Sequence, residues 1–242
     1  MSNFDKYRQN IVYLVQAGSR AYGLNRPDSD TDIRGVYIAP TEEIMGLRTP
    51  PEDLDQKQED KNREFWIWEL GKFCNLALKS NPNVLETLWS LNHLQLKIFE
   101  PFRKHRKAFL SKRIITTYRG YATSQFHKMG QDQNQKGEIR WKHAMHLLRL
   151  MHSGTVALHV GEIPVLIGGK QAELLKRVGR GEMDFGFVMS EYKKSEKIFD
   201  EAADSTKLPE HPDEDLVNEM LIAARIDNLR RQSKNDWGKF IT

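Results

Sequence analysis

Apolar positions in the first ninety residues follow the period of strands and then that of helices. Residues 11–17, IVYLVQA, form an apolar run that is typical of a buried strand, and residues 31–40, TDIRGVYIAP, predict a second strand that begins with polar residues. Aromatic and β-branched residues in 64–70, EFWIWEL, predict a third strand. The polar, proline-bearing stretch 48–62 between them is typical of a mobile loop.

Helical spacing follows the third strand. It stops near Ser80-Asn81-Pro82, where Asn81, Pro82 and Glu86 are expected to cap and stabilise the entry of a second helix. Strands that alternate with helices predict an α/β N-terminal half.

Strand signals nearly vanish after residue 93. Residues 100–129 and 140–160 have helical spacing and are divided by the polar stretch QDQNQKGE. A short extended segment, IPVLI, and two or three more helices follow. The pattern therefore predicts an α+β chain, with an α/β domain over 1–92 and a mainly helical domain over 93–242.

Candidate chemistry concentrates at residues 17–35, AGSRAYGLNRPDSDTDIRG. Asp30 and Asp32 begin the second strand, and residues two apart in a strand face the same side, so both carboxylates should project together. Two adjacent carboxylates are costly unless a cation neutralises them, and oxygen ligands suit Mg²⁺ or Mn²⁺. A bare Asp-x-Asp in a turn is usually solvated, but the preceding Gly18-Ser19 makes the joint pattern more restrictive.

Gly18 and Ser19 extend this site towards a nucleotide. Gly18 allows the backbone to approach a ligand, and the Ser19 hydroxyl with the amides of Ser19 and Arg20 is suited to phosphate oxygens. Arg20 and Arg34 add candidate positive charge. The segment therefore predicts a binding site for a metal-bound nucleotide.

A third carboxylate is commonly required where two metal ions clamp the attacking and leaving oxygens of a phosphoryl transfer. Glu64, near the start of the third strand, is the first candidate, and Asp60 and Glu59 are the alternatives. In that strand Glu64, Trp66 and Trp68 share one face.

GSRAYGLNRPDSDTDIRGVY resembles the signature of nucleotidyltransferases of the DNA polymerase beta superfamily, Gly-Ser followed by Asp-x-Asp on the next strand. The chain is more closely similar to the predicted nucleotidyltransferases associated with RNA repair, a family also found in bacteriophages. NPNVLETLW, KHAMHLLRL and LPEHPDEDLVNEML resemble later blocks of that family, so the resemblance covers nearly the whole chain.

The resemblance implies a catalytic domain with a small mixed sheet at 1–92, followed by the helical domain. It implies triphosphate binding by Gly18 and Ser19, metal binding by Asp30 and Asp32, and the third-acid position for Glu64. Aspartate is the usual third acid in the superfamily, so Glu64 departs from its pattern.

The helical block KHAMHLLRL adds basic residues. On a helix, Lys142, His146 and Arg149 share one face, which is suited to a triphosphate or an RNA backbone, and His143 borders that face. Hydrogen-bonding or packing roles are favoured over metal binding for both histidines. Tyr118 and Tyr121 are at helical spacing, which favours the core over base stacking.

Charge is uneven along the chain. The net charge of +4 comprises −3 for residues 1–100, +10 for 101–150 and −3 for 151–242. A basic middle segment attracts polyanions, so RNA is a candidate partner, with a solvated basic face as the alternative.

The remaining composition indicates a cytoplasmic protein. No apolar run approaches the length of a membrane span, and the N-terminus lacks the apolar core of a signal peptide. The single cysteine, Cys74, lies in an apolar helical pattern and is expected to be buried rather than reactive.

The resulting hypothesis is a metal-dependent enzyme that transfers a nucleoside monophosphate from an NTP, with ATP favoured, to an RNA end such as that of tRNA. A protein or small-molecule acceptor is an alternative, as is a non-catalytic regulator that binds a nucleotide or RNA. A nuclease in the helical half is disfavoured, because no acid-base pair is evident there.

Overall fold

The structure, a computed structural model, describes residues 2–58, 62–91, 93–136 and 139–236. Within these ranges the chain is α+β, as predicted, with one five-stranded mixed sheet in the order β3-β4-β2-β1-β5. Strands β2 and β4 are parallel, and the other neighbours are antiparallel. The strands are β1 (Ile11–Ala17), β2 (Thr31–Tyr37), β3 (Asp53–Gln58), β4 (Arg63–Glu69) and β5 (His93–Gln95).

Eleven α-helices are defined in the described residues. Their bounds are α1 (Asn3–Tyr7), α2 (Gly18–Ala21), α3 (Thr41–Met45), α4 (Leu70–Leu78), α5 (Pro82–Trp89), α6 (Glu100–Lys104), α7 (Arg113–Lys136), α8 (Trp141–Val160), α9 (Gly169–Gly179), α10 (Phe185–Ser205) and α11 (Glu214–Asp236). Short 3-10 turns occur at Arg8–Asn10, Lys97–Phe99 and Arg106–Phe109. Asn81 caps α5 and Pro82 is its first residue, as predicted.

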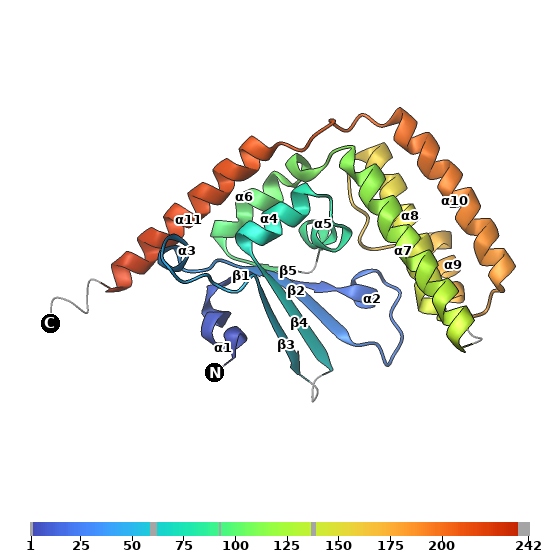
Figure 1. The fold of residues 1–242 in the computed structure, drawn as a ribbon, viewed down its shortest axis with the longest axis horizontal. Helices are drawn as coiled ribbons and strands as arrows, with labels where there is room; N and C mark the ends of the chain where they lie inside the picture. Colours follow the sequence, from blue (N-terminus) through green and yellow to red (C-terminus); the bar gives the residue numbers. More distant parts are fainter. Residues whose placement is uncertain (1, 59–61, 92, 137–138, 237–242) are drawn as a thin grey trace.

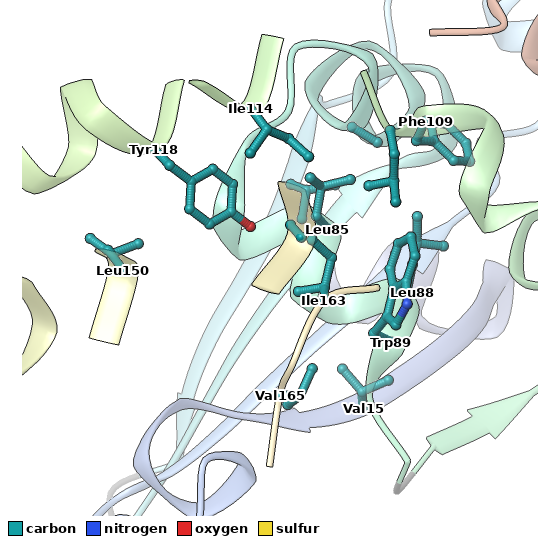
Figure 2. Close-up of a cluster of buried hydrophobic side chains, with 14 of the residues drawn as sticks. Val15, Leu85, Leu88, Trp89, Phe109, Ile114, Tyr118, Leu150, Ile163 and Val165 are labelled. Atoms are coloured by element: carbon teal, nitrogen blue, oxygen red, sulfur yellow. The ribbon is translucent and has the colours of Figure 1, made fainter. Parts of the chain in front are cut away.

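The two faces of the sheet pack differently. One face contributes Val15, Val36 and Trp68 to a large core shared with α4, α5 and the helices beyond, whereas the other packs around Tyr37 and Ile67 with α1. Figure 1 shows α4, α5 and α6 on the first face, with α7 to α10 beside them. Figure 2 shows core side chains from β1, α5, α7, α8 and the segment after α8 meeting in one cluster.

The final described helix returns to the sheet half. Helix α11 packs on α3, α4 and α6, and Arg225 donates to both carboxylate oxygens of Glu69, at 3.3 Å each. Asn228 donates to the carbonyl of Ala39. These contacts join the last helix to residues near the end of β2 and β4.

Some local expectations were wrong. The predicted loop 48–62 contains β3, which pairs with β4 although Leu54 is its only fully buried apolar residue. A polar strand forms here because it lies at the edge of the sheet, where only part of each side chain must be buried. Helix α7 continues through most of QDQNQKGE, which was expected to divide two helices. IPVLI lies between α8 and α9, outside any helix or strand.

The sheet also continues past residue 92, since β5 pairs with β1 through His93–Gln95. No helix in the described ranges is both long and apolar enough to span a bilayer.

Candidate active site

Asp32 and Glu64 lie side by side on neighbouring strands. They are register partners in the parallel pair β2–β4, and Asp32 also lies opposite Ala17 of β1. Lateral neighbours in a sheet point to the same face, so both carboxylates lie on the face that α4 and α5 cover further along. Asp30 precedes β2 and is exposed. The register between the two strands places Asp32 beside Glu64, and Asp30 is close enough to influence the pKa of Asp32. We call these three side chains the carboxylate row.

Gly18 is required by its contact with Asp32. Its φ is +65°, and a Cβ placed there would lie 1.9 Å from Oδ2 of Asp32. The left-handed conformation and the missing side chain both favour glycine, and they let the turn after β1 approach the carboxylate. Helix α2, which begins at Gly18, has four residues, so its dipole is small and backbone proximity is its main contribution.

The pKa of Asp32 reports the charges around it. Burial raises the pKa, and the nearby carboxylates of Glu64 and Asp30 raise it further, while Arg34 and Lys142 act in the opposite direction. Like charges and burial disfavour the ionised form. Asp30, Asp32 and Arg34, which are close in sequence, therefore interact with the distant Glu64 and Lys142 at one site.

A cavity of about 240 Å³ opens beside Asp32. Its walls come from β1, α2, β2, α5, α8 and Val165, and its charged or titratable lining residues are Tyr22, Asp32, Arg34, Glu86, Lys142 and His146. Val15 and Val165, at the margin of the core in Figure 2, form part of its apolar wall. The cavity thus combines an apolar side with cationic groups near a carboxylate row, a combination suited to a nucleotide.

Arg20 holds the loop before β2. Its Nη2 donates to the carbonyl of Ser29 at 2.7 Å, and its Nε donates to the carbonyl of Asp30 at 3.2 Å. Ser19 accepts a backbone hydrogen bond from Leu24. The guanidinium predicted to bind phosphate is therefore engaged in positioning Asp30.

Arg149 lies below the cavity rather than in its wall. It is 3% exposed, and its Nη1 lies 2.5 Å from Oε1 of Glu86. The guanidinium also lies over the ring of Tyr22, 4.0 Å from the centroid, and the Tyr22 hydroxyl donates to Oε2 of Glu86 at 2.6 Å. The predicted alignment of Arg149 with Lys142 and His146 thus does not bring its charge to the ligand side, because Glu86 already neutralises it.

Lys142 and His146 do line the cavity. Burial lowers the pKa of His146 to about 3, and the positive charges of Arg149 and Lys142 act in the same direction. A neutral imidazole is a hydrogen-bonding group here and adds no charge. His143, on the neighbouring turn of α8, is partly buried and is not in the cavity wall.

Glu86, Tyr22 and Val165 were missed as site residues. Glu86 was interpreted as part of a helix entry, but α5 buries nearly every residue, and a carboxylate within such a helix is a signal of a buried partner. Tyr118 is buried, as expected, and Tyr121 accepts a hydrogen bond from Asn81. Cys74 is buried, and burial raises its pKa to about 12, which agrees with the predicted packing role.

The carboxylate row has the donor chemistry for a divalent cation. Glu64 is 49% exposed on its side chain and lies 3.7 Å from Nζ of Lys57, so it can rotate towards Asp32. Within the described residues, no three Asp, Glu, His or Cys side chains converge as a ready metal centre. Glu59 and Asp60, the alternatives for the third acid, lie outside those residues. Among the carboxylates, Asp32 fits the role of a cation ligand best. Burial and the neighbouring carboxylates raise its pKa, and a bound cation would stabilise its ionised form.

Comparisons with known proteins place the chain in a family. The RNA repair pathway DNA polymerase beta family matches residues 2–222. The uncharacterized YcgL of Bacillus subtilis is 37% identical over 84 residues, which are 35% of this chain and 32% of YcgL. The uncharacterized MJ0002 of Methanocaldococcus jannaschii is 28% identical over 155 residues, which are 62% of this chain and 61% of MJ0002.

The matched regions thus span less than two thirds of either relative. A nucleotidyltransferase-like protein from Exiguobacterium sibiricum aligns with 84% of this chain and 72% of its own, at 10% identity and a TM-score of 0.32. With the family match extending over nearly all of the described residues, the chain belongs to the RNA repair pathway DNA polymerase beta family.

Proposed function

We propose that the protein transfers a nucleoside monophosphate from an NTP to an acceptor hydroxyl, with an RNA end as the favoured acceptor and ATP as the favoured donor. The observation that carries the proposal is the lateral pairing of Asp32 with Glu64 beside Gly18, at the mouth of a cavity that contains Arg34 and Lys142. The carboxylate of Asp32 and the cations of Arg34 and Lys142 thereby line one cavity.

Cationic and acidic residues have different roles in the proposed reaction. Arg34 and Lys142 bind phosphate oxygens of the NTP, and Gly18 lets the turn approach them. The acceptor oxygen forms a bond to the α-phosphorus while the bond to pyrophosphate breaks. Glu64, half exposed at the edge of the row, receives the proton of the acceptor hydroxyl when it lies within about 3 Å.

Asp30, Asp32 and Glu64 would hold Mg²⁺ or Mn²⁺, which when bound supplies charge neutralisation to the phosphates and lowers the pKa of a coordinated hydroxyl. The protein's own contribution is to place the three carboxylates. Arg20 fixes the loop at Asp30, and Gly18 fixes the approach to Asp32.

The acceptor assignment has less support from the basic segment 101–150 than its charge suggests. Much of that charge is paired with acids from later in the chain: Lys107 with Glu162, Lys112 with Glu210 and Arg113 with Glu214. RNA therefore remains the favoured acceptor mainly through the family, whose description places it in RNA repair.

Label transfer from each α-labelled NTP, with Mg²⁺ or Mn²⁺, to total RNA and to total protein tests the proposal. We expect wild-type protein to label RNA and the Asp30→Asn, Asp32→Asn double variant to lose that label by at least about 100-fold, because both cation ligands are lost. Asp28→Asn, an exposed carboxylate in the same loop, is the matched control. Label on protein alone would show that the acceptor is a protein and not RNA. No label under any condition would refute nucleotidyl transfer.

A non-catalytic nucleotide-binding protein is the second candidate, favoured by one observation: the third acid is a glutamate that lies next to Lys57. Such a protein would bind ATP in equilibrium dialysis and incorporate none of it. Retained ATP binding without label transfer in the same preparation would decide for this candidate.

A further inference from the structure

Trp66 is an exposed indole beside the carboxylate row. It pairs with Arg34 in the register of β2 and β4, one row along from Asp32 and Glu64 and on the same face. Residues two apart in a strand are separated by about 7 Å. The side chain is 41% exposed, although tryptophan is usually among the well-buried residues.

Helix α4 covers Trp68 and leaves Trp66 exposed. Trp68, on the same face, is 6% exposed and packs against Phe73 of α4, with ring centroids 6.1 Å apart. Trp66 lies one row nearer the start of β4, where Figure 1 shows the β3–β4 hairpin extending away from α4 and α5. In the described part of the chain, no ring contact or hydrogen bond of its indole is recorded.

Trp66 lies outside the cavity that is proposed to hold the NTP. The cavity is lined by β1, α2, β2, α5 and α8, and Trp66 is not in its wall, although its register partner Arg34 is. In an in-line displacement, the attacking and leaving oxygens lie on opposite sides of the phosphorus. With the triphosphate in the cavity, the acceptor therefore approaches from the side of β4 and β3, where the indole is exposed.

The charges around the indole suit a nucleic-acid strand. Arg34 lies beside Trp66, and Lys57, 63% exposed on its side chain, lies opposite Glu64 in the neighbouring row. Asp55 of β3 lies opposite Trp66 and is the acidic residue in the row that Trp66 forms with Arg34. Single-stranded nucleic acids bind where aromatic rings stack on bases and nearby cations meet the backbone.

We propose that Trp66 is the platform on which the terminal unpaired base of a single-stranded RNA acceptor stacks, which places its ribose hydroxyl beside Asp32 and Glu64. The proposal rests on the proposed function for its chemistry, but the stacking itself is a binding property. It names an unpaired RNA end as the substrate class and an aromatic group that reads the base with little sequence preference.

Fluorescence anisotropy of a 5′-labelled 12-nucleotide single-stranded RNA tests the platform. We expect Trp66→Ala to weaken RNA binding by about tenfold, because stacking of one base is lost, and Trp66→Phe to retain most of the affinity. Leu94→Ala, an exposed apolar side chain at the opposite edge of the sheet, is the matched control and should bind as wild type does. ATP binding, measured by equilibrium dialysis, should be unchanged in all variants.

Three outcomes would overturn the proposal. They are the absence of RNA binding by wild-type protein, equal RNA binding by wild type and Trp66→Ala, and a loss of ATP binding instead of RNA binding in Trp66→Ala. RNA binding that depends on Trp66 without label transfer would uphold the platform and refute the proposed function, so the two failures are distinguishable.

Crosslinking gives a measurement that needs no variant. RNA with 4-thiouridine at its 3′ end, irradiated on wild-type protein, should crosslink to the peptide that contains Trp66. Crosslinks confined to other peptides would place the RNA end elsewhere and overturn the proposal.

Discussion

His146 has a partly buried imidazole that lines the cavity together with Lys142 and Arg34. Its lowered pKa, about 3, follows from burial first and from neighbouring cations second. The group is therefore neutral at physiological pH and donates or accepts a hydrogen bond without adding to the positive charge. In the proposed complex the phosphates of the NTP would meet the charge of Lys142 and Arg34, whereas His146 is suited to a neutral polar group.

This shifted pKa predicts a pH-dependent stability. In the unfolded chain His146 takes up a proton below about 6.5, and in the folded chain only near 3, so acidification over this window favours unfolding. We expect wild type to lose on the order of 2 kcal/mol through this group between pH 7 and pH 5, and His146→Gln to lose correspondingly less. Urea unfolding at pH 7, 6 and 5 measures the difference.

His211→Gln, which replaces an exposed histidine, serves as the control and should follow wild type. Equal pH slopes for wild type and His146→Gln would show that His146 titrates normally in the folded protein.

At this scale the sequence identified residues whose evidence is local. Gly18, Asp30 and Asp32 lie within fifteen residues, and spacing alone places them near a turn and on one strand. Glu86 and Arg149 are separated by 63 residues, and the sequence assigned Glu86 to a helix entry and Arg149 to a phosphate-binding face. Only the packing of α5 against α8 shows that they neutralise one another.

The Glu86–Arg149 pair joins elements as well as charges. Glu86 belongs to α5, Arg149 to α8, and Tyr22 follows α2, so the three side chains connect the turn after β1 to two helices. Breaking a buried ion pair by removing one partner leaves an uncompensated charge. The network therefore holds both walls of the cavity at a fixed separation.

We predict that Glu86→Leu lowers the free energy of unfolding by about 3–5 kcal/mol, because Arg149 is left buried and unpaired. The double variant Glu86→Leu, Arg149→Met should lose less than the single one, since an apolar pair leaves no buried charge. Urea unfolding measures each value. Lys112→Ala, which breaks an exposed pair with Glu210, is the control and should cost at most about 1 kcal/mol.

A Glu86→Leu variant within 1 kcal/mol of wild type would contradict this role. So would a double variant less stable than the single one, because the loss would then come from packing rather than from charge.

Elements with a clear apolar period were predicted, and those stabilised by their neighbours were not. Strands β1, β2 and β4 each contain several apolar residues that are buried. Strand β3 is mostly polar, and it forms because its backbone pairs with that of β4. The basic segment 101–150 likewise has ion-pair partners, among them Glu162 and Glu214, that lie later in the chain. Edge pairing and long-range ion pairs leave little trace in local sequence.

The two predicted domains share one hydrophobic core in the described structure. The large cluster includes Val15 of β1, Leu88 of α5, Leu150 of α8 and Ala224 of α11. Strand β5 and the Arg225–Glu69 pair add contacts across residue 92. The sheet half therefore depends on later residues for much of its burial.

We expect a fragment of residues 1–92 to lack a cooperative unfolding transition, because the helix α5 and the sheet would expose apolar side chains that the later helices cover. Circular dichroism melting and amide-proton dispersion in NMR spectra measure this, with the 242-residue chain as the reference. A sharp melt and dispersed spectrum for the fragment would instead establish 1–92 as an independent domain.

The return of α11 to α3 and α4 has a consequence for biosynthesis. A ribosome releases the carboxylate row early, but the cavity wall is complete only after Val165 has been made, and Glu69 meets Arg225 later still. Domains fold as units during synthesis, so this chain must wait for its later helices. A prematurely terminated translation product would therefore carry the Gly-Ser and Asp-x-Asp residues without an assembled cavity around them.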